Sequence, residues 1–137
     1  MINVLVADDH AIVRSSLTEL FASTPDIATI AECADGSEVV ERAGATRPDV
    51  ILMDLTMPGM DGMTATQALL LVQPEARVDV LTASFGPDVV QQAQACGARG
   101  FLLKGEDPAG LLESVRQVAA GGTAWCEAAA RVLQASI

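Results

Sequence analysis

The sequence is poor in aromatic residues, in basic residues and in histidine. Only 3% of its 137 residues are aromatic while 50% are hydrophobic, so aliphatic side chains must build the core. The 8 basic residues are outnumbered by 18 acidic ones, which leaves a net charge of -10. A surface this acidic repels nucleic-acid backbones, so we expect this chain not to bind DNA by itself.

Cysteine pairs and long apolar runs are also missing. Cys33, Cys96 and Cys126 lie far apart without a C-x-x-C pair, and with His10 as the single histidine a zinc site is hard to assemble. No apolar stretch approaches the roughly 18 residues of a membrane-spanning helix. The N-terminus lacks the pattern of a signal peptide. We therefore expect a cytoplasmic protein without membrane contact, with room for one ordinary domain.

Five short apolar runs alternate with segments of helical character. The runs show little strict alternation, which is typical of parallel strands covered on both faces. They are Ile2–Ala7, Ile27–Cys33, Val50–Met53, Val78–Thr82 and Gly100–Leu103. The helical segments are His10–Ala22, Ser37–Ala45, Met63–Val72, Pro87–Cys96 and Pro108–Ala120. This pattern predicts an α/β fold of (βα)5 type, a doubly wound five-stranded parallel sheet.

Polar side chains follow the predicted strands directly. Asp8 and Asp9 come after the first strand, Asp54 after the third, Thr82 ends the fourth and Lys104 follows the fifth. In a doubly wound sheet ligands bind outside the carboxyl ends of the strands, so these side chains should gather at one edge. Three neighbouring carboxylates repel one another unless a cation joins them, and oxygen ligands suit Mg²⁺. A carboxylate beside Mg²⁺ can attack phosphorus and form an aspartyl phosphate, with Lys104 and Thr82 compensating the charge.

Four stretches of the sequence resemble the receiver domains of two-component response regulators. They are VLVADDH (4–10), PDVILMDLTMPGMDG (48–62), VLTAS (80–84) and ARGFLLKG (98–105). The resemblance covers about residues 2–121 and implies a flavodoxin-like fold with strand order 2-1-3-4-5. We therefore predict a receiver domain over residues 1–121, followed by a C-terminal extension or linker over residues 122–137.

The resemblance also implies roles for individual residues at the acidic edge. Asp54 would accept a phosphoryl group from a sensor histidine kinase. Asp9 and Asp54 would bind Mg²⁺ directly, together with the backbone carbonyl of Thr56. Asp8 would assist through a metal-bound water.

A second group of residues would stabilise the phosphoryl group and transmit its arrival. The resemblance assigns the first task to Lys104, Thr82 and the backbone of Ala83. Thr82 and Phe101 would act as the switch that alters the face made by the fourth helix, the fifth strand and the fifth helix. Such a protein is not an enzyme in the usual sense, because it catalyses only its own phosphorylation and dephosphorylation.

Three further stretches indicate a subtype. DDHAIVR, GFLLKG and LLESVRQVAAGGTAW resemble receivers of the NarL/LuxR type, which usually carry a C-terminal helix-turn-helix domain. We expect the chain to be a fragment of a transcription regulator that reaches DNA only through an output domain absent here. A homodimer is a possible partner state. We also expect Trp125 to pack a short last helix, near Glu127–Gln134, on the domain or in a dimer.

Two other functions stay open at this point. The first is a stand-alone or degenerate receiver that acts only as a protein-binding module. The second is a phosphatase of the haloacid-dehalogenase type. That family needs a second aspartate two positions after the nucleophile, and this sequence has Thr56 there.

Asp79 departs from the apolar pattern of the fourth strand, VDVLT. A buried carboxylate without a partner would cost several kcal/mol. We therefore expect Asp79 to lie near the beginning of the strand or to have a partner.

Overall fold

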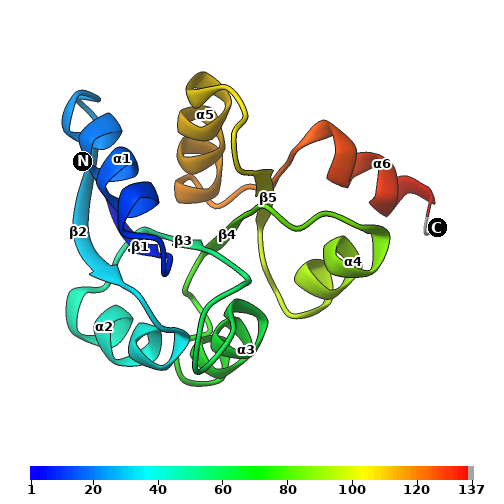
Figure 1. The fold of residues 1–137 in the computed structure, drawn as a ribbon, viewed down its shortest axis with the longest axis horizontal. Helices are drawn as coiled ribbons and strands as arrows, with labels where there is room; N and C mark the ends of the chain where they lie inside the picture. The colour runs from blue at the N-terminus through cyan, green and yellow to red at the C-terminus, as the bar shows by residue number, and fades with distance from the viewer. Residues whose placement is uncertain (136–137) are drawn as a thin grey trace.

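The computed structural model describes residues 1–135, and its centre is a six-stranded parallel sheet with helices on both faces (Figure 1). The strand order is β2-β1-β3-β4-β5-β6. The strands are β1 (Ile2–Ala7), β2 (Ile27–Cys33), β3 (Val50–Met53), β4 (Val78–Thr82), β5 (Gly100–Leu103) and β6 (Ala124–Trp125). The five apolar runs of the sequence thus form β1 to β5 with the predicted bounds.

The prediction of exactly five strands was wrong, because β6 adds a sixth strand at the free edge of β5. The Ala124 N–H donates to the Arg99 carbonyl at 2.9 Å, and the Cys126 N–H donates to the Phe101 carbonyl at 3.0 Å. A two-residue strand has no apolar periodicity of its own, so the sequence pattern could not indicate it. Its register, with Phe101 opposite Trp125, is parallel like the rest of the sheet.

Six α-helices connect or follow the strands in the described residues. They are α1 (Ala11–Ala22), α2 (Val39–Thr46), α3 (Gly62–Val72), α4 (Pro87–Ala95), α5 (Pro108–Ala119) and α6 (Glu127–Ala135). The predicted second helix is divided, since a 3₁₀ turn, η1 (Gly36–Glu38), precedes α2. Side chains cap the N-termini of two helices. Asp61 accepts a hydrogen bond from the Thr64 N–H at the start of α3, and Asp107 accepts one from the Ala109 N–H at the start of α5. Among the described residues no helix is long and apolar enough to cross a membrane.

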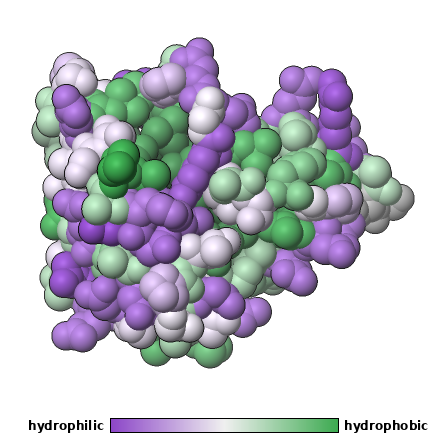
Figure 2. Space-filling view, in the orientation of Figure 1, coloured by the Kyte–Doolittle hydropathy of each residue, from purple (hydrophilic) through white to green (hydrophobic). Residues whose placement is uncertain are grey.

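The helices divide the core into two parts, one on each face of the sheet. Helices α1 and α5 cover one face, over buried aliphatic residues of β1, β3, β4 and β5. Helices α2, α3, α4 and α6 cover the other face, where Phe101 is the largest buried side chain of β5. Between α1 and α5 the surface is hollowed into an apolar groove of about 380 Å³, which reaches Lys104 (Figure 2).

Asp79 is the second residue of β4 and is fully buried, so the expectation of an early strand position with a partner is confirmed. Its Oδ2 accepts a hydrogen bond of 2.6 Å from the Ser114 hydroxyl of α5. Its Oδ1 is buried and has no hydrogen-bond partner within residues 1–135. Burial raises the pKa of Asp79 to about 7, against the lowering effect of Ser114.

Candidate functional site

The acidic edge is assembled by the backbone pairing of β1 and β3. Ala7 and Met53 are Cα partners at the ends of these strands, so Asp8 and Asp54 emerge next to each other. The Asp54 N–H donates to the Ala7 carbonyl at 2.9 Å, which fixes this juxtaposition. Their side chains are only 3% exposed. Two carboxylates buried side by side require a cation.

Lys104 supplies a positive charge to both carboxylates. Its Nζ lies 2.7 Å from Asp8 Oδ2 and 3.2 Å from Asp54 Oδ2. Lys104 follows β5, and its N–H donates to the carbonyl of Thr82 at 2.9 Å, which holds the residue beside the end of β4. Burial lowers the pKa of Lys104, but its hydrogen bond to Asp8 and the charges of Asp54 and Asp8 outweigh this, so the pKa is raised overall.

Asp54 itself is in an unfavourable environment for a charge. Burial is the largest effect that raises its pKa, and the negative charge of Asp8 adds to it. A long 3.3 Å hydrogen bond from the Thr56 N–H to Asp54 Oδ1, and the contact with Lys104, act in the opposite direction without cancelling the rise. A further cation beside Asp54 would therefore stabilise its ionised carboxylate.

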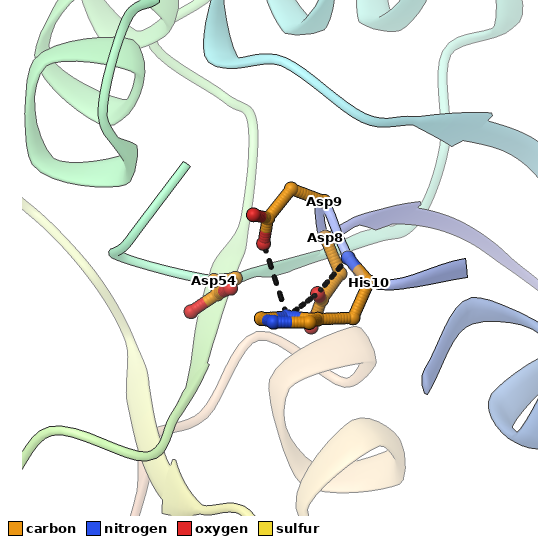
Figure 3. Close-up of side chains that lie close together, drawn as sticks. All are labelled: Asp8, Asp9, His10 and Asp54. Atoms are coloured by element: carbon orange, nitrogen blue, oxygen red, sulfur yellow. Dashed lines mark hydrogen bonds and ion pairs between the residues drawn. The ribbon is translucent and has the colours of Figure 1, made fainter. Parts of the chain in front are cut away.

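Asp9 and His10 complete the cluster, which Figure 3 shows in close-up. One ligand atom from each of Asp8, Asp9, His10 and Asp54 lies within 4.8 Å of the others. His10 Nδ1 is 3.2 Å from Asp8 Oδ1 and 3.1 Å from Asp9 Oδ1. From the sequence, His10 is expected at the rim of the cleft as a surface residue, and its side chain is 65% exposed. Its position directly after two strand-end aspartates was the signal for its place in the cluster.

The donor set fits a hard divalent cation. Asp9 Oδ1 is buried and lacks a hydrogen-bond partner in the described part of the chain, because the approach of His10 Nδ1 does not have hydrogen-bond geometry. Carboxylate oxygens dominate the cluster, and such oxygens are the ligands that Mg²⁺ prefers. The buried oxygen without a partner and the raised pKa of Asp54 are both features that a bound cation would relieve.

The loop after Asp54 is fixed by close backbone packing. A Cβ atom on Gly62 would lie 2.1 Å from the Asp54 carbonyl oxygen, so only glycine fits there. The Gly62 N–H also donates to the Leu55 carbonyl at 3.0 Å. This packing places Thr56 at the site, where its N–H contacts Asp54 and its side chain is exposed.

The remaining predicted residues lie at or near the same edge. Thr82 is fully buried, and its hydroxyl accepts from the Ser84 N–H at 3.1 Å, within its own loop. Ala83 follows it and is exposed. Phe101 is buried on the α4 side of β5 and makes an edge-to-face contact with Phe85, with ring centroids 6.4 Å apart.

Comparison with known proteins supports what this geometry suggests. Residues 4–116 match the family model described as "Response regulator receiver domain". The chain belongs to the response regulator receiver family. Receiver domains of this family are signalling modules rather than classical enzymes, and they typically bind Mg²⁺ at an acidic pocket.

Individual relatives identify the subtype of this receiver. The nitrate/nitrite response regulator NarL of Escherichia coli is 37% identical over 134 residues, which are 98% of this chain and 62% of that protein. The transcriptional regulatory protein LiaR of Bacillus subtilis is 40% identical over 88% of this chain and 57% of its own length. This receiver is therefore of the NarL/LuxR type, and it spans about three fifths of the length of these relatives.

Solved structures agree with this assignment. A LuxR-family two-component response regulator from Aurantimonas sp. has a TM-score of 0.92 and 32% identity, covering 98% of this chain and 96% of its own. The receiver domain of a putative NarL from Mycobacterium tuberculosis has a TM-score of 0.83 and 33% identity, covering 88% and 97%.

Proposed function

We propose that Asp54 accepts a phosphoryl group from a sensor histidine kinase. The observation that carries this proposal is the placement of Lys104 between two buried carboxylates, Asp8 and Asp54, at the carboxyl edge of the sheet. Scattered surface charges form no such arrangement, whereas a transferring phosphoryl group needs both a nucleophile and a nearby ammonium.

In the proposed reaction an oxygen of the ionised Asp54 attacks the phosphorus of a phosphohistidine. The bond from phosphorus to the imidazole nitrogen breaks, a bond from phosphorus to the carboxylate oxygen forms, and the imidazole leaves with the electron pair. Burial and the charge of Asp8 raise the pKa of Asp54 in the metal-free protein, so the ionised carboxylate that attacks phosphorus needs the charges of Lys104 and of the cation beside it.

Other residues of the site hold the metal and the phosphoryl oxygens in this proposal. Asp9, Asp54 and the carbonyl of Thr56 would hold Mg²⁺ directly, and Asp8 would assist through a metal-bound water. When bound, Mg²⁺ neutralises charge on the phosphoryl oxygens and on the carboxylates. Lys104 leaves its bridging position to pair with a phosphoryl oxygen, and Thr82 and the backbone of Ala83 contact another.

The readout of this reaction is proposed to be transcription. Residues 1–121 act as the receiver, and residues 122–137 lead towards a DNA-binding output domain, as the names and lengths of NarL and LiaR suggest. The switch pair Thr82 and Phe101 would pass the change to the α4–β5–α5 face. Homodimerisation of the receiver is compatible with this role. With a net charge of -10, the chain itself is not expected to contact DNA.

Mass spectrometry of the intact protein tests the proposal directly. Incubation with Mg²⁺ and acetyl phosphate should add one phosphoryl mass, which Asp54→Asn should abolish. Asp88→Asn, which removes an exposed carboxylate in the first turn of α4, is the matched control and should still be phosphorylated. Lack of a mass change with acetyl phosphate and phosphoramidate would favour a receiver that acts only as a binding module.

A further inference from the structure

Arg14, in the first turn of α1, contacts the loop that carries the acidic residues. Its Nη1 donates a hydrogen bond of 2.7 Å to the backbone carbonyl of Asp8. Its Nε lies 3.3 Å from Glu32 Oε1 on β2, so two nitrogens of one guanidinium serve two different partners. The Arg14 side chain is only 20% exposed, whereas arginine side chains are mostly exposed in proteins. The guanidinium is therefore fixed between β2 and the loop after β1 and is not a solvated surface charge.

The carbonyl that Arg14 contacts belongs to the peptide group between Asp8 and Asp9. On the other side of Asp8, its N–H donates to the Cys33 carbonyl at 2.9 Å, which ties that peptide group to β2. Both peptide groups of Asp8 thus have a partner outside the loop. These two contacts set the direction in which the Asp9 side chain leaves the backbone.

The Asp9 carboxylate has little else to orient it. Its Oδ1 is buried without a hydrogen-bond partner among residues 1–135. The nearby Nδ1 of His10 belongs to a side chain that is 65% exposed. The orientation of the Asp9 carboxylate therefore depends on its backbone, and this backbone is what Arg14 holds.

We propose that Arg14 is a positioning residue for the cation site: by holding the peptide group between Asp8 and Asp9, it keeps a carboxylate oxygen of Asp9 within 4.8 Å of one from Asp54. This inference rests on the proposed function, in which Mg²⁺ is the cation. Arg14 acts through Asp9 and contacts neither the cation nor the phosphoryl group. Removal of a residue that orients a metal ligand typically lowers metal affinity by about 10–100-fold.

Charge and geometry predict opposite effects for the loss of Arg14. Removal of a positive charge near a cation site should tighten cation binding by Coulomb's law. Removal of the contact that orients a ligand should weaken it. Arg14→Met removes both the charge and the contact, so the sign of the change in Mg²⁺ affinity distinguishes the two effects.

Arg42 provides a matched control on the same strand. Its Nη1 donates to the Glu32 carbonyl at 2.9 Å, and its Nη2 lies 3.6 Å from Glu38 Oε2. Arg42→Met therefore removes the same charge and the same two kinds of contact, with a carbonyl and with a carboxylate. The peptide group that it releases carries no proposed metal ligand.

Titration of the metal-free protein with MgCl₂, followed by the amide NMR shifts of Asp9 and Asp54, measures the Kd without phosphoryl transfer. Arg14→Met should raise the Kd for Mg²⁺ on the order of tenfold, whereas Arg42→Met should leave it unchanged or slightly lower. Arg14→Lys keeps the charge, but a single ammonium cannot reproduce the fork that reaches both partners, so the Kd should rise here too. This second variant carries the test if Arg14→Met does not fold.

Phosphorylation by acetyl phosphate at increasing Mg²⁺ concentrations separates positioning from direct catalysis. Arg14→Met should need more Mg²⁺ to reach half of its maximal rate, but at saturating Mg²⁺ its rate should equal that of the wild type. A lower rate at saturating Mg²⁺ would show that Arg14 acts on the phosphoryl group or its donor, and would overturn the proposal.

The outcomes separate this inference from the proposed function. An unchanged or lower Kd for Mg²⁺ in Arg14→Met, or a wild-type Kd in Arg14→Lys, would refute the positioning role and leave phosphorylation of Asp54 untouched. Weaker Mg²⁺ binding in both Arg14 variants, together with a wild-type protein that gains no phosphoryl mass, would support the positioning role and refute the phosphoacceptor function.

Discussion

The buried carboxyl of Asp79 should make the stability of this protein fall as the pH rises towards neutrality. In the unfolded chain its pKa is the ordinary value of 3.8, and in the folded protein burial raises it to about 7. Between these values the folded protein keeps a proton that the unfolded chain has lost. The free energy of unfolding therefore decreases by about 1.4 kcal/mol per pH unit over this interval, and the loss is complete above about pH 7.

The full effect of Asp79 amounts to about 4 kcal/mol between pH 3.8 and 7. Other carboxyls act in the opposite direction, because hydrogen bonds hold the pKa of Asp26 and of Asp35 below its usual range and their contribution is lost as the pH falls. A direct pH profile would mix these effects. Comparison with Asp79→Asn isolates the one group, since the amide has nearly the same shape and does not ionise.

Urea unfolding of both proteins at pH 5, 6, 7 and 8 measures the difference. From pH 5 to 8 the wild type should lose about 3 kcal/mol relative to Asp79→Asn, with unchanged m-values. Ser114→Ala is the matched probe: without the hydroxyl that donates to Asp79, the pKa rises further and the decline extends to higher pH. Parallel curves within about 0.5 kcal/mol would refute the reasoning, because Asp79 would then carry no anomalous proton.

Three further predictions concern the acidic edge and its loop. Gly62→Ala should lower the free energy of unfolding in urea by about 2–3 kcal/mol, because its Cβ would lie 2.1 Å from the Asp54 carbonyl oxygen. The control Gly44→Ala, whose Cβ would have no atom within 4 Å, should raise it by about 0.5–1 kcal/mol. Equal effects would contradict the packing argument. Asp54→Asn should stabilise the metal-free protein at pH 7, since it removes a charge that burial and Asp8 disfavour. It should also weaken the stabilisation by Mg²⁺, which for the wild type is about 1.4 kcal/mol at ten times the Kd. A destabilised variant would count against this electrostatic account. Lys104→Met should lower the free energy of unfolding by about 3 kcal/mol, because it leaves Asp8 and Asp54 without their cation. Adding Asp54→Asn to this variant should recover part of the loss. Full additivity of the two changes in a double-mutant cycle would show that the charges do not interact.

The sequence predicted the central sheet because its physics is local and periodic. Each apolar run that forms β1 to β5 is long enough to show that both faces are buried, and glycine or proline marks several of the boundaries. The carboxyl-edge rule then placed Asp8, Asp54 and Lys104 together without any coordinates. The placement of these three residues depends only on the order of the strands along the chain and on their parallel pairing.

What the sequence could not provide depends on contacts between distant residues. The partner of Asp79 is Ser114, 35 positions away on α5, and nothing in the helix pattern distinguishes that serine from an exposed one. Strand β6 has two residues, too few for a period. The contact of His10 with Asp8 and Asp9 depends on side-chain rotamers at the start of α1, which residue order does not determine.

Asp79 and β6, the two features that departed most from the sequence pattern, meet at a single residue. Gly100 is the strand partner of both Asp79 and Ala124. A Cβ at position 100 would lie 2.3 Å from Asp79 Oδ1 and 2.9 Å from the Ala124 carbonyl oxygen, so glycine is required by the buried carboxyl on one side and by the sixth strand on the other. A larger residue there would have to displace one of them. The buried acid, the glycine and the added strand therefore form one structural unit, and a change in the charge of Asp79 should disturb the pairing of β6 with β5.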